Sequence, residues 1–161
     1  MQRPPPPPSK RKPELSLRAR ALQLLARREH TRAELERKLA PYAEDPAEVQ
    51  AVLDDFSARG WLSESRAIEQ LVHAKRSRFG TARIRQALMA KGVSNESMAP
   101  ALENLKETEV AAARAVWARK FKTPPGTAAD RARQVRFLQS RGFSLDIAMR
   151  VVRGAGGEDE N

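Results

Sequence analysis

Apolar residues recur every three or four positions along most of the chain, which is the spacing of helices buried on one face. Hardly any stretch alternates apolar and polar residues with β-branched side chains, as half-buried strands do. The pattern predicts nine helices, at residues 15–28, 31–40, 46–59, 64–78, 81–91, 95–106, 108–121, 127–141 and 144–153. The expected fold class is therefore all-α.

Short polar motifs mark where several of these helices begin. Thr31 and Glu34 have the spacing of a capping box, in which the hydroxyl meets an orphan amide and the glutamate reaches back to the cap. Asp45 precedes Pro46, a residue suited to the first helical position. Three serines are further N-cap candidates, Ser63, Ser94 and Ser144.

Three segments share one pattern: LAPYAEDPAEVQAVL from Leu39, LMAKGVSNESMAPAL from Leu88 and LQSRGFSLDIAMRVV from Leu138. Their starts lie 49 and 50 residues apart (39, 88 and 138). The eleventh position is always apolar, and the fifth is glycine in two segments, where it can take the left-handed conformation that ends a helix. A three-helix unit buries little apolar surface alone, so stacked units are favoured over the alternative, a compact bundle with accidental similarity.

We therefore predict an elongated array of three tandem three-helix repeats with flexible tails. Repeat 1 covers residues 14–60, repeat 2 residues 61–107 and repeat 3 residues 108–153. A proline-rich basic arm at residues 1–13 and an acidic tail at residues 154–161 are expected to be disordered.

The chain carries 30 Lys and Arg against 20 Asp and Glu, a net charge of +10. The excess is uneven, because residues 14–59 hold eight cations and nine acids, whereas residues 108–153 hold ten cations and three acids. This balance indicates a polyanionic partner or an acidic protein surface that meets the middle and C-terminal repeats.

Two groups of cations are the candidate partner-binding residues, and each group can neutralise phosphates or pair with carboxylates. The first group is Lys75, Arg76, Arg78, Arg83, Arg85 and Lys91. The second group is Arg119, Lys120, Arg131, Arg133, Arg136 and Arg141. A merely solvated basic face is the alternative interpretation of both.

Few aromatic residues are available for stacking on bases. Phe79, beside Arg78, is the one plausible candidate, and a core position is its alternative. Trp117 fits a buried helix stripe, and Trp61 with Leu62 fits a hydrophobic joint between repeats, so both tryptophans are expected in the core. The two histidines, His30 and His73, are expected at the surface or at helix ends.

Catalytic patterns are missing from the sequence. There is no cysteine, neither histidine stands in a metal-ligand spacing or a triad order, and no GxxxxGK[ST] motif occurs. We therefore expect no enzyme, no metal and no cofactor. No apolar run reaches the length of a membrane span and the first residues lack an apolar signal region, so we expect a cytoplasmic protein without a membrane partner.

The segments TRAELERKL from Thr31, GWLSESRAIEQLVHAKRSRFGTARIRQALMAKGVS from Gly60 and LQSRGF near the end resemble the RecX family, bacterial regulators of the RecA recombinase. The similarity covers nearly all of residues 15–153 and is most specific in its middle portion.

The resemblance implies a non-enzymatic, monomeric modulator, mainly an inhibitor, that acts in DNA repair and the SOS response. Such a protein lies in the groove of the RecA filament on single-stranded DNA and limits filament growth, strand exchange, ATPase and co-protease activity. The alternative is a stand-alone DNA- or RNA-binding protein with helix-turn-helix-like units, although no polar side chains identify a helix that reads bases.

Overall fold

The structure is a computed structural model that describes residues 14–157. Within that range the chain forms nine α-helices, one short 3₁₀ helix and no strand. Repeat 1 contains α1 (Leu17–Arg27), α2 (Arg32–Leu39), η1 (Ala40–Tyr42) and α3 (Pro46–Ala58). Repeat 2 contains α4 (Glu64–Arg76), α5 (Thr81–Ala90) and α6 (Asn95–Glu107). Repeat 3 contains α7 (Glu109–Lys120), α8 (Ala128–Ser140) and α9 (Leu145–Ala155).

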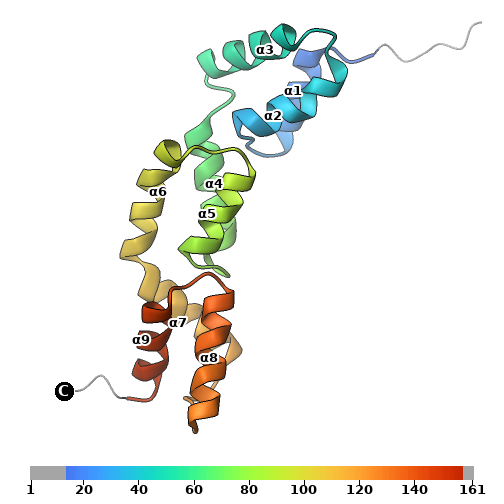
Figure 1. The fold of residues 1–161 in the computed structure, drawn as a ribbon. Coiled ribbons are helices and arrows are strands. Elements are labelled where there is room, and N and C mark those ends of the chain that lie inside the picture. The colour runs from blue at the N-terminus through green and yellow to red at the C-terminus, as the bar shows by residue number, and fades with distance from the viewer. Residues whose placement is uncertain (1–13, 158–161) are drawn as a thin grey trace, which may run out of the picture.

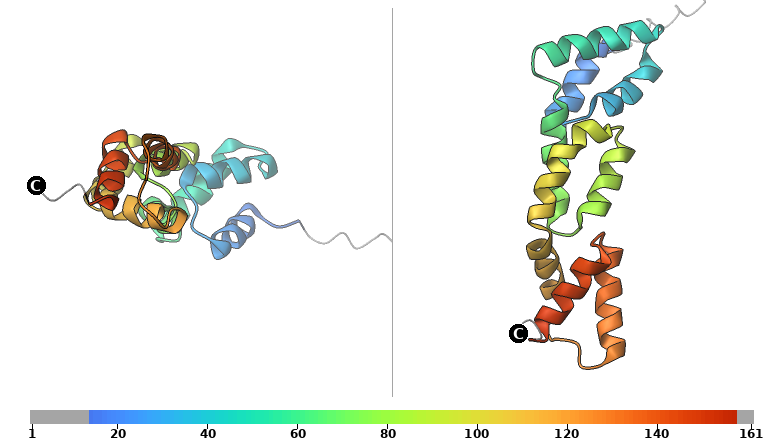
Figure 2. Two further views of the ribbon diagram at one scale, coloured as in Figure 1. Left: turned by 90° about the horizontal axis from the view of Figure 1, so that it is seen from below. Right: turned by 60° about the vertical axis from the view of Figure 1, so that its left-hand side comes forward.

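The three groups of helices follow one another along a single long axis (Figures 1 and 2). This arrangement confirms the elongated array and excludes the compact bundle. Each observed helix begins and ends within two residues of its predicted limits. Helix α9 includes Gly154 and Ala155, which the sequence placed in the tail, while the predicted arm at 1–13 and the tail residues 158–161 lie outside the described residues.

The predicted helix starts are formed by the expected side chains. The hydroxyls of Ser63, Ser94 and Ser144 each accept a hydrogen bond from the backbone amide three residues on. The carboxylate of Asp45 accepts one from the amide of Ala47 at 2.9 Å. Each such cap satisfies an amide that has no partner within its helix, a contribution of about 1 kcal/mol.

Each repeat has its own hydrophobic core. The residues that open the repeated pattern, Leu39, Leu88 and Leu138, are completely buried in the cores of repeats 1, 2 and 3. The eleventh position of the pattern is also buried in every repeat. The apolar ladder of the sequence therefore belongs to the architecture, since burying one such side chain stabilises the fold by about 1.5–3 kcal/mol.

The two glycines of the pattern adopt the left-handed conformation. Gly92 has a φ of +76° and Gly142 a φ of +94°, each directly after the C-cap of its helix. In repeat 1 the corresponding Ala43 has a φ of −101°, and the chain turns through η1 instead. The Cβ of an alanine raises the energy of the left-handed conformation, so repeat 1, which has Ala43 at this position, turns in a different way.

Repeats 2 and 3 meet where the turn between α8 and α9 contacts the start of α5, a region that we call the 2–3 joint (Figure 1). The amide of Gly80 donates to the carbonyl of Arg141 at 2.7 Å, and the amide of Ala82 donates to the carbonyl of Gly142 at 3.2 Å. A Cβ on Gly80 would overlap the carbonyl of Gly142, so the joint depends on close backbone approach.

Replacing Gly142 by alanine tests this close approach. The new Cβ would lie 2.7 Å from the backbone nitrogen of Arg83 and would also strain a positive φ. We expect Gly142→Ala to lower the free energy of unfolding by about 2–3 kcal/mol in urea titrations. Gly60→Ala is the matched control, because its φ of +74° carries the same backbone strain but no atom lies within 4 Å of the new Cβ. Equal losses of unfolding free energy in the two variants would show that backbone strain, and not close approach at the 2–3 joint, causes the destabilisation.

The two tryptophans differ from each other in burial. Trp61 is 42% exposed and packs edge-on against Phe56, with 5.2 Å between ring centroids, so its predicted core position is wrong. The ring of Trp61 covers the core of repeat 1 from outside, whereas the next residue, Leu62, lies in that core and is only 5% exposed. Trp117 is partly buried against the core of repeat 3, and its Nε1 donates to Gln134 at 2.8 Å.

Candidate functional site

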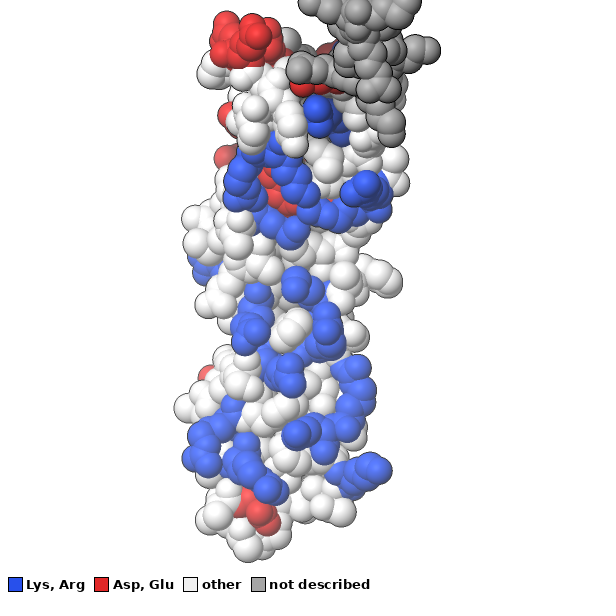
Figure 3. Space-filling model, turned by 90° about the vertical axis from the view of Figure 1, so that its right-hand side faces the viewer, with Lys and Arg blue, Asp and Glu red and all other residues white. Residues whose placement is uncertain are grey.

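Many cations gather on one face of the array, over the middle and lower part of the view in Figure 3. Eight of the twelve candidate residues are exposed, namely Arg78, Arg83, Arg85, Arg119, Lys120, Arg131, Arg133 and Arg136. The other four are partly buried, namely Lys75, Arg76, Lys91 and Arg141. The two sequence groups are neighbours in space, because the 2–3 joint brings Arg141 of the second group against the turn that carries the first.

Four cations from both groups surround the ring of Phe79. Their side-chain charge centres lie 5.0 Å (Arg83), 5.4 Å (Arg78), 5.5 Å (Lys75) and 5.9 Å (Arg141) from the ring centroid. These distances allow cation–π attraction. Phe79 itself is partly buried against the core of repeat 2. The ring is therefore the edge of a core with cations around it, which favours the core interpretation over an open stacking platform.

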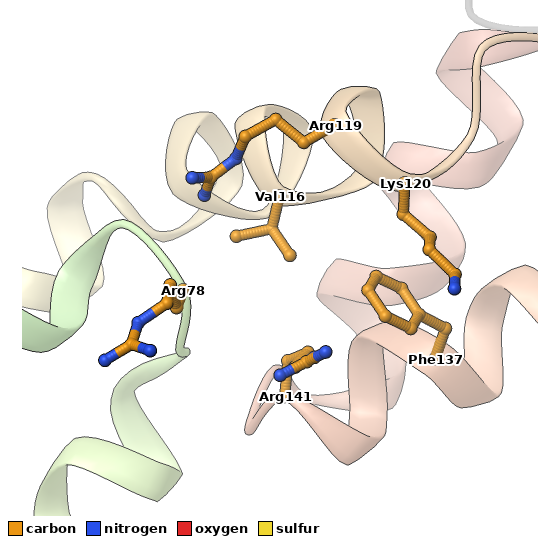
Figure 4. Close-up of a pocket in the computed structure, with 6 residues that line it drawn as sticks. All are labelled: Arg78, Val116, Arg119, Lys120, Phe137 and Arg141. Carbon is orange, nitrogen blue, oxygen red and sulfur yellow. The ribbon is translucent and has the colours of Figure 1, made fainter.

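Beside Phe79 lies a surface hollow of about 250 Å³, which we call the basic pocket (Figure 4). Its lining residues are Arg78, Val116, Arg119, Lys120, Phe137 and Arg141. Arg78 comes from the α4–α5 connection, Arg119 and Lys120 from the end of α7, and Arg141 from the C-cap of α8. No acid lines the pocket, and among the described residues none of its four cations forms a salt bridge.

Two predicted contact residues have partners inside the array. Arg76 donates to Glu109 at 3.1 Å and to the carbonyl of Leu105 at 2.6 Å, with only 16% of its side chain exposed. Lys91 lies 3.1 Å from a carboxylate oxygen of Glu34. A charge that is partly buried needs such a counter-charge, so these two cations hold the repeats together.

The corresponding contact between repeats 1 and 2, the 1–2 joint, is centred on Glu34. Its carboxylate is buried and accepts from Arg28 at 2.7 Å in addition to its ion pair with Lys91. Burial alone raises the pKa of Glu34, but the hydrogen bonds from Arg28 and Lys91 outweigh burial and hold that pKa below its usual value. The predicted capping box is therefore only half formed: Thr31 accepts from the amide of Glu34, while the glutamate turns to the joint.

His30 is buried in repeat 1, directly before the N-cap of α2. Of its two predicted positions, the surface is therefore wrong and the helix end is correct. Its Nδ1 lies 3.0 Å from the carbonyl of Arg28, and its Nε2 lies 3.2 Å from the ammonium of Lys38. A lysine ammonium only donates, so Nε2 accepts and Nδ1–H donates, which requires the neutral ring. Burial lowers the pKa of His30, and the nearby charges of Arg28 and Lys38 lower it further.

Acidification below the usual histidine pKa of 6.5 is expected to destabilise the fold through His30. The unfolded histidine binds a proton there while the folded one resists it, so protons favour the unfolded state, by at most about 1.4 kcal/mol per pH unit. Urea titrations at pH 7.5 and pH 5.5 measure the difference. His30→Phe should reduce it, and His73→Phe, at an exposed position, should leave it unchanged. A full acid loss in His30→Phe would contradict the assignment.

The described part of the chain offers little else for chemistry. Across residues 14–157 no group of three or more histidine, aspartate or glutamate side chains is placed to hold a metal ion. Over the same range no helix has the length and apolar character needed to cross a membrane.

An elongated stack of three-helix units is the architecture of a repeat protein, in which each unit packs only on its neighbours. Residues 18–56, 63–102 and 107–152 match, in turn, the first, second and third three-helix domains of RecX. The chain is 54% identical over 150 residues to the regulatory protein RecX of Leptothrix cholodnii, covering 93% of this chain and 96% of that one. It is 48% identical over 141 residues to the regulatory protein RecX of Ralstonia nicotianae, covering 88% and 89%. The chain belongs to the RecX family, which confirms the resemblance seen in the sequence.

Solved structures have the same fold. The crystal structure of RecX from Lactobacillus salivarius superposes with a TM-score of 0.75 at 18% identity, covering 87% of this chain and 94% of that one. A second crystal structure of a regulatory protein RecX gives a TM-score of 0.69 at 19% identity, covering 84% and 70%. The likeness therefore extends to the order of all three repeats.

Proposed function

We propose that this protein is a modulator, mainly an inhibitor, of the RecA recombinase. It binds as a monomer in the groove of the RecA filament on single-stranded DNA and limits filament growth, strand exchange, ATP hydrolysis and co-protease activity. Membership of the RecX family supports the choice of RecA. The observation that carries the proposal for this chain is the basic pocket, where four cations gather without an acid.

The shape of the molecule suits this role. Backbone hydrogen bonds across the 2–3 joint fix repeat 3 on repeat 2, so the basic face extends over both as one unit. An elongated array of this kind can contact successive subunits of a filament. Cations on such a face speed the encounter with an acidic surface or a phosphate backbone and fix the register of binding.

The proposed contact residues are the candidate cations other than Arg76 and Lys91, which have partners inside the array. They are Lys75, Arg78, Arg83, Arg85, Arg119, Lys120, Arg131, Arg133, Arg136 and Arg141. Arg133 also lies 3.6 Å from Asp130, a neighbour on its own helix, and an exposed pair of this kind is weak enough to yield to a partner.

A strand-exchange reaction tests the proposal. RecA is assembled on single-stranded DNA, homologous duplex is added, and the yield of joint molecules is followed with increasing amounts of this protein. The proposal predicts that the rate of exchange and the rate of DNA-dependent ATP hydrolysis fall together as filaments shorten. Unaltered rates at saturating amounts of protein would contradict it.

The acid-free pocket also suits a second candidate, a nucleic-acid-binding protein that acts without RecA. That function predicts tight binding to naked DNA or RNA, a steep decline of affinity with salt, and sequence-selective footprints. The RecA proposal predicts none of these selective footprints.

A further inference from the structure

The two joints of the array are built from equivalent residues. Residues of repeats 1 and 2 correspond at a spacing of 49, as Leu35 and Ile84 show, both completely buried (35 and 84). In the 1–2 joint the hydroxyl of Thr31 donates to the carbonyl of Lys91 at 2.6 Å. In the 2–3 joint the amide of the equivalent Gly80 donates to the carbonyl of Arg141, at 2.7 Å. Lys91 and Arg141 therefore occupy the same place, each as the C-cap of the docked helix.

The charges at these equivalent places are not the same. Two acids of repeat 1, Glu29 and Glu34, correspond to Arg78 and Arg83 in repeat 2 (29 and 78, 34 and 83). Glu29 pairs with Arg66 at 3.0 Å, and Glu34 neutralises the C-cap lysine of the 1–2 joint. In the 2–3 joint the C-cap arginine and two further arginines lie around the ring of Phe79, and no acid of residues 14–157 stands at the place equivalent to Glu34.

Glu109 is an acid of the 2–3 joint, but it does not neutralise the C-cap arginine Arg141. Its two carboxylate oxygens are taken by Arg76, by the amide of Thr81 at 3.2 Å and by the hydroxyl of Thr81. It is 8% exposed and does not line the basic pocket. Figure 3 shows the same contrast: the upper group of cations encloses acidic atoms, whereas the group in the middle of the face encloses uncharged surface.

We propose that the basic pocket binds a phosphate group, which takes the place at the 2–3 joint that the carboxylate of Glu34 takes at the 1–2 joint. The guanidinium groups of Arg78, Arg119 and Arg141 are its donors, and Lys120 adds charge at the edge of the hollow (Figure 4). This inference deepens the proposed function, on which the choice of a nucleic-acid strand as the main source of the phosphate rests. Free phosphate and nucleotides share the same chemistry.

A phosphate suits the site better than a protein carboxylate does. Three arginines from three separate segments line one hollow, and each planar guanidinium can donate two parallel hydrogen bonds. A carboxylate has two oxygens and one charge, as at the 1–2 joint, where one arginine and one lysine satisfy Glu34. A phosphate presents additional oxygens to a third guanidinium.

The decisive variant installs the missing acid. Arg83→Glu places a carboxylate where repeat 1 has Glu34, next to the C-cap arginine of the joint. The change also removes the hydrogen bond that Arg83 donates to the carbonyl of Ser140 at 2.9 Å across the joint. Arg83→Ala loses the same bond without adding an acid, and it should keep the response to phosphate. The melting temperature is measured in phosphate and in chloride at equal ionic strength, and the affinity for a fluorescein-labelled oligothymidylate is measured without RecA. The wild type should melt higher in phosphate, whereas Arg83→Glu should melt at the same temperature in both salts. The affinity of Arg83→Glu for the oligonucleotide should be at least about tenfold lower than that of the wild type.

Two controls separate the site from general charge and from folding. Arg37→Glu makes the same charge change at an exposed position of repeat 1, and its response to phosphate should remain that of the wild type. Arg78→Gln removes one donor from the pocket without adding an acid and should bind the oligonucleotide several-fold more weakly with an unchanged circular dichroism spectrum.

The sources are distinguished by competition against the labelled oligonucleotide. Displacement by unlabelled oligonucleotide at far lower concentration than by inorganic phosphate or ATP assigns the site to a strand, and the reverse assigns it to a free phosphate; either result supports a phosphate site. Displacement by oligoglutamate as effectively as by oligonucleotide would overturn it, as would a phosphate response that persists in Arg83→Glu. Because RecA is absent, these results are independent of the strand-exchange test.

Discussion

The double variant Arg78→Glu/Arg119→Glu is expected to bind RecA filaments at least about a hundredfold more weakly than the wild type. Both side chains line the basic pocket, both are exposed, and neither forms a salt bridge within the described residues. Each change removes a charge-assisted contact worth about 1.5–3 kcal/mol and adds repulsion against an acidic partner. Equilibrium titration of labelled filaments at fixed salt measures the loss.

The control for this variant is Arg27→Glu/Arg37→Glu. It changes the net charge by the same amount, and its positions lie in repeat 1, exposed and away from the pocket. We expect its affinity to decline by no more than a few-fold, through the long-range field alone. Equal losses in the two double variants would show that net charge, and not the pocket, determines binding.

Glu109→Ala is expected to lower the free energy of unfolding by about 3–5 kcal/mol. This carboxylate is held by Arg76 and by Thr81 at the 2–3 joint, and both members of the Glu109–Arg76 pair are largely buried. Removing the acid leaves the Arg76 guanidinium without a counter-charge in a place that water reaches poorly, which is more costly than losing an exposed pair. Urea unfolding followed by circular dichroism measures the change.

Glu103→Ala is the matched control for this prediction. Glu103 pairs with Lys106 at 3.5 Å, but both side chains are about 70% exposed (72% and 69%), so the expected loss is below about 1 kcal/mol. Glu109→Gln keeps the acceptor oxygen without the charge and should lie between the two. If Glu109→Ala were no less stable than Glu103→Ala, the ion pair at the joint would not hold the repeats.

Because Arg76 is part of the 2–3 joint, a charge change at this residue does not test filament binding cleanly. Arg76→Glu would place a second carboxylate beside Glu109 and disrupt the contact between repeats 2 and 3. Weakened filament binding by such a variant would report a damaged fold. Arg78 and Arg119 avoid this problem, because both are exposed and neither has an ion pair among the described residues.

The helices and their grouping into repeats were predictable because they depend on local information. Apolar spacing, serine caps and the recurring Leu39, Leu88 and Leu138 act within one turn or one repeat, and the structure places each of these leucines in its own core. The exception is the turn at Ala43, where the sequence offers no glycine and the chain uses a 3₁₀ turn.

The assembly of the site was not predictable in the same way. Phe79 and Arg141 are 62 residues apart (79 and 141), and they meet because two glycines allow two backbones to approach across the 2–3 joint. Nothing in the spacing of cations distinguishes Arg76, which has an internal acid, from Arg78, which has none. The correspondence of Glu34 with Arg83 was visible in the sequence, but its meaning required the geometry of both joints.

His30 shows the same limit for a buried polar group. Glu29 before it is charged and Thr31 after it is polar, so the sequence gives no sign that the ring is buried. In the fold, the carbonyl of Arg28 and the ammonium of Lys38 give each ring nitrogen a hydrogen-bond partner. The neutral ring is therefore buried without an unsatisfied polar atom.

The central claim is that this protein binds the RecA filament more tightly than it binds DNA alone. Its most direct test is the affinity of the wild type for RecA filaments on a labelled single strand, compared with its affinity for the same naked strand at the same salt concentration. We predict that filaments are bound at least about tenfold more tightly. Binding to filaments that is no tighter than binding to the naked strand would contradict the account.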